Sequence, residues 1–111
     1  MMTINRNNKG RGYEQKICRE LISLGYKDCV TSRSESRNTD NQGIDFVNTG
    51  SFAIQAKAAE RSVPYWRLLQ NMAKAKKGIP LIVHKRNNKP ETVTMLKEDF
   101  YTLGILHYTD A

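Results

Sequence analysis

Two short segments of alternating apolar and polar residues, joined by a turn, constrain this chain most strongly. Residues 43–48 read Gly-Ile-Asp-Phe-Val-Asn, residues 49–51 form a Thr-Gly-Ser break, and residues 52–57 read Phe-Ala-Ile-Gln-Ala-Lys. Because successive side chains point to opposite sides of a strand, this pattern predicts a β-hairpin with one apolar and one polar face. The predicted apolar face consists of Ile44, Phe46, Phe52, Ile54 and Ala56.

The polar face of the predicted hairpin has the residue types of a hydrolytic site. With residues 49–51 as the loop, Asp45 falls opposite Gln55, and Lys57 falls opposite Gly43. Opposed positions lie about 5 Å apart at Cβ, which allows two oxygen-bearing side chains to share one metal ion beside an ammonium group. A solvated strand face is the simpler interpretation of any one of these residues. Asp is rare in strands, however, and the three polar groups together favour a functional site.

Length and charge indicate one domain with a polyanionic partner. The chain has 111 residues and a formal net charge of +7. We expect a flexible basic arm at residues 1–9 and a single domain at residues 10–111, because a chain of this length supports one core. Clustered Lys and Arg release counterions from a phosphate backbone, so nucleic acid is the leading candidate partner.

The sequence gives no sign of a membrane span, a secretion signal or a zinc site. No apolar run has the length of a membrane span and no signal-peptide pattern opens the chain, so we expect a soluble, cytoplasmic protein that is not secreted. Cys18 and Cys29 stand outside any CxxC or Cys/His cluster and are expected to be buried thiols. His84 and His107 have no evident Ser or Cys partner for nucleophilic catalysis, and we expect structural roles for both.

The order of predicted elements indicates a central mixed sheet flanked by helices. The expected elements are a helix at 10–24, a strand at 27–33, the two hairpin strands, a helix at 64–77, strands at 79–85 and 92–96, and a helix at 97–103. Residues 34–42 form a polar loop that is a candidate substrate contact. The first helix has an apolar stripe of Tyr13, Ile17, Leu21 and Leu24, and the second a stripe of Tyr65, Leu68, Leu69, Met72 and Ala75. The second helix also has a polar face of Arg67, Gln70, Lys74 and Lys77, for which a solvated surface is the simpler interpretation.

The motifs in this order resemble the PD-(D/E)XK nuclease superfamily. Glu14 lies in the first helix, the Gly-Ile-Asp run ends at Asp45, the Gln-Ala-Lys run ends at Lys57, and Gln70 lies in the following helix. The small size, the Arg-Gly-Tyr-Glu opening of the first helix and the basic loop look most like the archaeal and phage Holliday junction resolvases. The resemblance implies a restriction-endonuclease-like α/β fold with a central mixed five-stranded sheet, in the order α-β-β-β-α-β-β-α.

The resemblance also implies roles for the polar residues. Asp45 would be the central metal-bridging carboxylate and Glu14 the helix-borne carboxylate, with the Gln55 oxygen and the Ala56 carbonyl completing a site for Mg²⁺ or Mn²⁺. Lys57 would orient or help to deprotonate the attacking water and offset charge in the transition state. The reaction implied is hydrolysis of a phosphodiester bond by a DNA endonuclease of recombination and repair.

Gln55 departs from the family pattern, which has Glu or Asp at this position. An amide oxygen can ligate Mg²⁺, but this hard ion prefers carboxylates, so the loss of one negative charge weakens binding. Three explanations remain open: a natural Gln variant, a substitution made to bind substrate without cutting it, and a degenerate site that only binds.

The partner implied by the resemblance is branched DNA, bound by a homodimer in a prokaryotic or phage-infected cell. Resolution of a four-way junction needs two symmetrical nicks, and hence two active sites related by a twofold axis. The residues expected to contact nucleic acid are Arg11, Arg33, Ser34, Arg37, Gln70, Lys74 and Lys77. The dimer surface is expected at residues 79–83 or at Phe100, Tyr101 and Leu103, which a protein core would explain equally well.

Three alternative functions remain open. A flap or single-strand endonuclease of the same fold would be a monomer that cuts non-junction DNA equally well. A non-catalytic DNA-binding module would show salt-sensitive binding that is indifferent to Mg²⁺ and to Lys57→Ala. A small basic protein with a protein partner is the third alternative, and the polar hairpin face argues against it.

Overall fold

The computed structural model describes residues 6–32 and 43–109 of the chain, and it confirms the predicted order of helices and strands. The elements are α1 (Arg6–Ser23), β1 (Val30–Thr31), β2 (Phe46–Val47), β3 (Phe52–Ala58), α4 (Tyr65–Ala73), β4 (Ile79–Lys85), β5 (Thr92–Thr94) and α5 (Lys97–Thr109). Helix α1 begins at Arg6, inside the segment predicted as an arm, and α5 continues six residues beyond the predicted end at residue 103.

The strands form two sheets, and the predicted continuous five-stranded sheet is wrong. One sheet has β1 and β2 in antiparallel pairing, and the other has the order β3-β4-β5. Strands β3 and β4 are parallel and β4 and β5 are antiparallel, so the larger sheet is mixed. The sheets separate because β1 and β2 are only two residues long, and the chain before β2 leaves regular strand geometry.

The predicted hairpin register is also wrong, because the segment before β2 does not pair as a regular strand. The backbone N–H of Asp45 donates to the carbonyl of Ile54 at 2.9 Å, which places Asp45 opposite Ile54 instead of Gln55. The predicted single apolar face divides accordingly. Ile44 packs in the cluster beside α4, whereas Phe46, two residues later, packs in the cluster beside α1.

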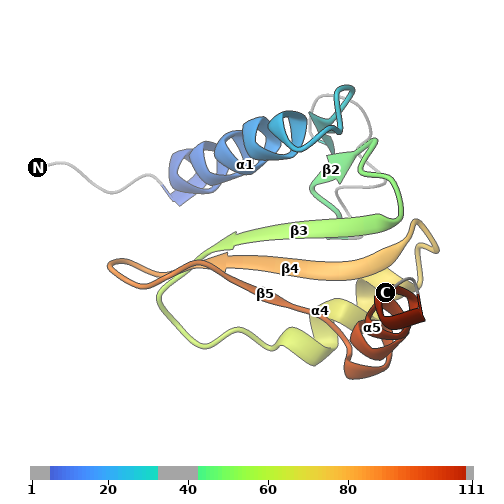
Figure 1. Ribbon diagram of the computed structural model, residues 1–111. Coiled ribbons are helices and arrows are strands. Elements are labelled where there is room, and N and C mark those ends of the chain that lie inside the picture. The colour runs from blue at the N-terminus through green and yellow to red at the C-terminus, as the bar shows by residue number, and fades with distance from the viewer. Residues whose placement is uncertain (1–5, 33–42, 110–111) are drawn as a thin grey trace, which may run out of the picture.

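Strand β3 is buried on both faces, and this differs from the predicted half-exposed strand. Helix α1 covers one face of the larger sheet and α4 covers the other (Figure 1). Burial of both faces is typical of parallel strands joined by a helical crossover, as β3 and β4 are through α4. The buried cluster on the α1 side contains Tyr13, Ile17, Cys29, Phe46 and Ile54. The buried cluster on the α4 side contains Ile44, Ala53, Leu69, Met72 and Ile82.

Both predicted helical stripes face these clusters, with one exception. Tyr13 and Ile17 of α1 are buried, and Leu69 and Met72 of α4 are buried. Leu24 is 77% exposed, because α1 ends at Ser23 and the chain turns away there. The spacing of apolar residues therefore predicts which side of each helix packs on the sheet.

Helix α4 ends at Ala73, four residues before the predicted end. Lys76 has a φ of 53° and Gly78 a φ of 141°, so the chain turns sharply into β4. A Cβ at Gly78 would lie 2.7 Å from the carbonyl oxygen of Ser51, and the next residue, Ile79, donates its N–H to that oxygen at 2.8 Å. Glycine at this position therefore lets the α4–β4 connection pack against the β2–β3 loop.

The two thiols expected to be buried lie beside each other between α1 and the segment before β1. The Sγ atoms of Cys18 and Cys29 are 3.6 Å apart, and both cysteines are free. Cys29 is buried and Cys18 is half-buried, and burial raises the pKa of Cys29 to about 12. Among the residues that the structure describes, no helix has the length and apolar character to cross a membrane.

We expect Met72→Ala to lower the free energy of unfolding by about 2–5 kcal/mol, because Met72 is fully buried between α4 and β4 and its loss leaves a cavity. Trp66→Ala on the same helix should change it by only about 0.5 kcal/mol, since Trp66 is 61% exposed. Urea denaturation monitored by circular dichroism measures both values. Equal effects of the two substitutions would contradict the assigned packing of α4.

Candidate active site

Asp45 joins the two sheets through its main chain and its carboxylate. Its carbonyl accepts the N–H of Ser32 at 2.8 Å, which extends the β1–β2 ladder, and its own N–H donates to Ile54 of β3. The carboxylate oxygen Oδ2 accepts the N–H of Ala56 at 2.8 Å. Asp45 is only 8% exposed, so its charged group is held in a fixed position away from bulk water.

The second polar group of the candidate site is the buried amide oxygen of Gln55. Ala56, which binds Asp45, is its neighbour in β3, and Gly43 lies against the Gln55 amide, with the position of a Gly43 Cβ 3.5 Å from Nε2. Gln55 is 8% exposed, and its Oε1 accepts no hydrogen bond from the residues that the structure describes. A buried acceptor without a donor costs about 1–3 kcal/mol, so this oxygen is a strong candidate for a ligand that supplies positive charge.

Lys57 lies two residues beyond Gln55 in β3, and its side chain therefore leaves the strand on the same face. It is half-buried, and within the described ranges its ammonium group makes no ion pair or hydrogen bond. In the parallel ladder Lys57 stands opposite His84 of β4. A half-buried ammonium without a carboxylate partner is available to an anionic ligand.

Glu14, the predicted helix-borne carboxylate, is buried in the structure. It is 5% exposed on α1, next to Tyr13, whose ring packs with Ile54 in the α1 cluster. An acidic side chain is rarely buried in a core unless it has a binding or structural role, and Glu14 and Asp45 are both buried.

The oxygen donors around β3 are of the type that a hard divalent cation prefers. They carry less negative charge than a set with a carboxylate at residue 55. The Asp45 carboxylate, the Gln55 amide and the Ala56 backbone carbonyl supply oxygen, which Mg²⁺ and Mn²⁺ prefer. Residues 6–32 and 43–109 contain no group of three or more His, Cys, Asp or Glu side chains arranged to hold a metal ion. This result agrees with the presence of an amide at residue 55.

Helix α1 is fastened to the β4–β5 turn by an ion pair. The Lys16 ammonium lies 2.6 Å from the Glu91 carboxylate and 3.6 Å from that of Glu20. The hydrogen bond from Lys16 lowers the pKa of Glu91, and the same bond raises the pKa of Lys16. The Tyr13 hydroxyl nearby is buried, and burial together with its interaction with Glu91 raises its pKa.

We expect Glu91→Gln to lower Tm slightly at pH 7 and by less at pH 3. Because its folded-state pKa is lowered, Glu91 contributes stability that is present above its ordinary pKa of 4.5 and is lost as the pH falls through the lower folded value. Lys16 contributes below its ordinary pKa of 10.5, and this contribution is lost as the pH rises through the higher folded value. Thermal denaturation of both proteins across this range measures the difference. An equal effect at both pH values would contradict the ion pair.

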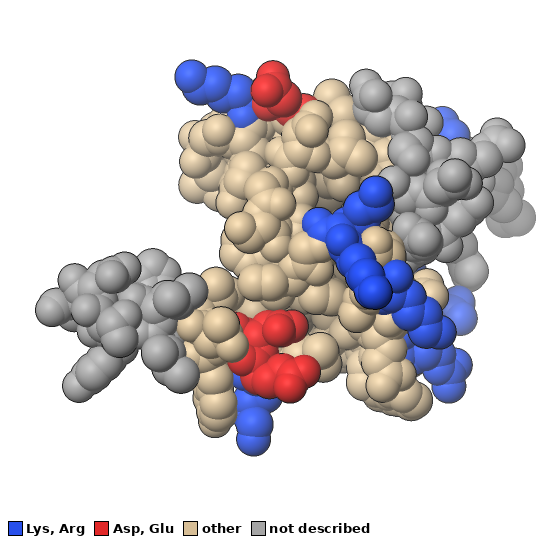
Figure 2. All heavy atoms as spheres, turned by 90° about the vertical axis from the view of Figure 1, so that its right-hand side faces the viewer, with Lys and Arg blue, Asp and Glu red and all other residues tan. Residues whose placement is uncertain are grey.

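The expected nucleic-acid contacts lie on the surface where the structure describes them. Arg11, Gln70, Lys74 and Lys77 are exposed. The remaining three, Arg33, Ser34 and Arg37, lie outside the described residues. Because α4 ends at Ala73, the lysines at 74 and 77 belong to the α4–β4 connection instead of the predicted helical face. Figure 2 shows Lys and Arg side chains gathered in a band on the side of the molecule where this connection and β2 lie.

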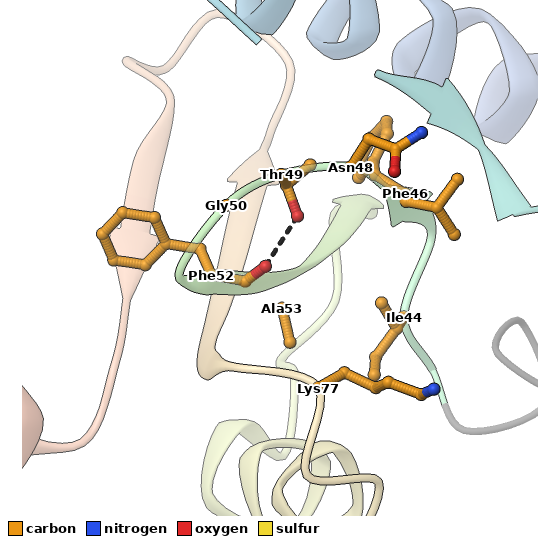
Figure 3. Close-up of a pocket in the computed structure, with 9 residues that line it drawn as sticks. Ile44, Phe46, Asn48, Thr49, Gly50, Phe52, Ala53 and Lys77 are labelled. Carbon is orange, nitrogen blue, oxygen red and sulfur yellow. Dashed lines mark hydrogen bonds between the residues drawn. The ribbon is translucent and has the colours of Figure 1, made fainter. Parts of the chain in front are cut away.

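A cavity of about 440 Å³ that the sequence did not predict opens at the amino-terminal end of β3. The side chain of Lys77 extends beneath Ile44 there, and the hydroxyl of Thr49 closes the β2–β3 loop by donating to the carbonyl of Phe52 at 2.6 Å (Figure 3). Of the predicted site residues that the structure describes, only Lys77 lines this cavity. Its walls come from β2, β3 and the α4–β4 connection, which are distant from one another in the sequence. A pattern within one segment therefore cannot predict this cavity.

The fold and site together define a mixed α/β protein with an acid, an amide and a lysine gathered at one parallel strand. No protein-family model matches the sequence, and no curated protein matches it. One solved structure that the chain resembles is Hjc, a Holliday junction resolvase from the archaeal hyperthermophile Archaeoglobus fulgidus. The identity is 16%, the match covers 72% of this chain and 73% of that chain, and the TM-score is 0.42. Since this TM-score is below 0.5, the function has to be argued from the site itself.

We expect Gln55→Glu to lower Tm without metal, because it adds a buried negative charge, and to bind Mn²⁺ about tenfold more tightly than the unsubstituted chain. Isothermal titration calorimetry and the Mn²⁺-dependent rise in Tm measure the two effects. Gln70→Glu makes the same chemical change on the exposed side of α4 and should alter neither. Tighter Mn²⁺ binding by both variants would contradict the assignment of residue 55 as a metal ligand.

Proposed function

We propose that this protein is a metal-dependent, structure-selective DNA endonuclease that hydrolyses phosphodiester bonds, of the Holliday junction resolvase type. The observation that carries the proposal is the group at β3: a buried carboxylate fixed by Ala56, a buried amide oxygen without a partner in the described chain, and a half-buried, unpaired lysine on the face of that amide. A buried acceptor without a donor is costly to fold, so its position in β3 beside the residue that binds Asp45 and two residues from Lys57 favours a reaction site over a structural role.

Each residue of the group has a role that follows from its position. Asp45, the Gln55 oxygen and the Ala56 carbonyl would hold Mg²⁺ or Mn²⁺, with Glu14 as the carboxylate contributed by α1. The ion, when bound, supplies a water of lowered pKa and polarisation of the phosphate. Lys57 places a positive charge where negative charge accumulates on the phosphate, and its ammonium can donate a hydrogen bond that orients the attacking water. The N–H of Ala56 keeps the Asp45 carboxylate in one orientation during these events.

The charge of the chain supports DNA as the substrate. The net charge of +7 and the exposed Arg11, Lys74 and Lys77 provide contacts to backbone phosphates that carry no sequence information. Selectivity would then come from the shape of the DNA. A four-way junction is the substrate that we propose, cut by a homodimer whose two sites make symmetrical nicks.

Helix α5 is the dimer surface that we propose, because it exposes large apolar side chains to solvent. Phe100 and Tyr101 are 58% and 55% exposed, and Val93 on the outer strand β5 is 60% exposed. Ile82 of β4, in the other segment considered for dimerisation, is fully buried within the α4 cluster. The exposed residues therefore favour α5 and β5 over β4.

A non-catalytic DNA-binding module is the second candidate function. It is favoured by the lack, in the described part of the chain, of a three-acid metal cluster. It differs from the proposal in one respect that can be measured, since its DNA binding needs neither a divalent ion nor Lys57. A flap or single-strand endonuclease would share the chemistry and differ only in substrate shape.

The proposal is tested by cleavage of a labelled four-way junction and a linear duplex of the same sequence in Mg²⁺ or Mn²⁺. We expect Gln55→Glu to cut the junction at least about tenfold faster than the unsubstituted chain, because it restores a charged ligand. Adding Lys57→Ala to Gln55→Glu should reduce the rate by about 10²–10³-fold, because it removes the positive charge at the phosphate.

Lys27→Ala in the same Gln55→Glu background is the matched control, since Lys27 is an exposed lysine in the connection between α1 and β1. Its cleavage rate should stay within about twofold of the Gln55→Glu rate. Tight junction binding without cleavage by either the unsubstituted chain or Gln55→Glu would overturn the nuclease proposal in favour of the binding module. Equal cutting of junction and duplex would overturn only the junction specificity.

A further inference from the structure

A second cavity lies at the carboxyl ends of the two parallel strands. It has a volume of about 410 Å³, and its walls come from α4, the end of β4, the β4–β5 turn and the start of β5. The lining residues are Tyr65, His84, Arg86, Lys89, Pro90 and Thr92. In open α/β sheets, ligands bind in the crevice beyond the carboxyl ends of the parallel strands, and this cavity occupies that place.

The inner wall of this cavity is a histidine held in one orientation. His84 is 2% exposed, and its Nε2 lies 2.7 Å from the carbonyl oxygen of Ala59. A carbonyl only accepts, so Nε2 carries the proton, and in the neutral imidazole Nδ1 accepts. The Tyr65 hydroxyl, 2.5 Å from Nδ1, therefore donates to it, and the lone pairs of the phenol oxygen remain available. The wall is thus preorganised, with Tyr65 fixed edge-on to His84 at a ring separation of 5.8 Å.

The rim of the cavity carries two positively charged side chains that form no ion pair among the described residues. Within the described residues, Arg86 makes one hydrogen bond, a long one of 3.5 Å to the carbonyl of Arg61, and Lys89 makes no ion pair. The two nearby carboxylates are engaged elsewhere, since Glu60 accepts the N–H of Asn87 at 2.7 Å and Glu91 binds Lys16. Two cations beside an aromatic ring form a binding surface for a phosphate that carries a planar base.

The cavity adjoins the candidate active site across one strand. His84 stands directly opposite Lys57 in the parallel ladder, and Thr92 stands opposite His84 on the other side. Directly paired residues of neighbouring strands lie about 4.8 Å apart and point to the same face. Lys57 therefore lies one strand away from the cavity wall, so a nucleotide in the cavity would lie beside a phosphate bound at Lys57.

We propose that this cavity binds an unstacked nucleotide next to the phosphate that is cut, with its phosphate between Arg86 and Lys89 and its base against Tyr65 and Pro90. This inference rests on the proposed function and names the class of substrate: DNA with an unstacked nucleotide at a branch. A base inside a stacked duplex cannot enter a pocket of this kind, so the cavity selects DNA whose stacking is already broken.

The experiment titrates the full chain, labelled with ¹⁵N, with the 5′-phosphorylated dinucleotide pdTpdT and with dTpdT, which lacks the 5′-phosphate. We expect pdTpdT to shift the amide signals of Tyr65, Lys89 and Thr92. The shifts should weaken with dTpdT and disappear in the double variant Arg86→Gln and Lys89→Gln. The matched control is Arg19→Gln with Lys27→Gln, which removes the same charge from an exposed arginine and an exposed lysine outside the cavity and should retain the shifts.

Junction affinity, measured by fluorescence anisotropy over a series of salt concentrations, provides the second readout. The Arg86 and Lys89 double variant should bind the four-way junction about tenfold more weakly, with a salt slope shallower by about 1–2, and the control should bind almost normally. Shifts confined to other residues, or equal losses in both double variants, would overturn the inference. Dinucleotide shifts at the cavity without any junction binding would support the cavity and overturn the proposed function, so the two failures are distinguishable.

Discussion

The position of Asp45 between the two sheets is the constraint on which the rest of the structure depends. Its carbonyl accepts a hydrogen bond that extends the β1–β2 ladder. Its N–H donates to the carbonyl of Ile54 in β3, and its carboxylate accepts the N–H of Ala56 in the same strand. Because a single residue makes all three contacts, the smaller sheet and the candidate site share one anchor. The carboxylate is therefore oriented by the fold itself, and the cost of burying it is offset by backbone hydrogen bonds.

Sequence patterns predicted the order of the elements and the packed side of each helix, because these depend on spacing within one segment. The stripe with Leu69 and Met72 packs as expected, and β4 has the predicted bounds. The register at Asp45 and the burial of Gln55 could not be predicted in the same way. Both depend on partners distant in the chain, namely β4 pairing along one edge of β3 and the irregular segment at the other edge.

The same distinction explains which parts of the site the sequence indicated. Asp45, Gln55 and Lys57 stand out because polar residues interrupt apolar runs, and the structure places all three around β3. His84 gave no such signal, since a lone histidine in an apolar strand is typical of a core position. Its importance becomes visible only when β3, β4 and β5 are side by side, with Lys57, His84 and Thr92 in one row.

The amide at residue 55 also bears on the order in which ligands assemble. A cluster of carboxylates repels a polyanion until a cation neutralises it, so DNA and metal have to arrive together at such a site. With a neutral oxygen at this position and an unpaired ammonium two residues away in the described chain, the local field is less negative, so under the proposed function DNA would bind the protein before the metal does. Residence on DNA and the onset of chemistry would then be separate events, and the supply of divalent ions would start the reaction in a complex that is already formed.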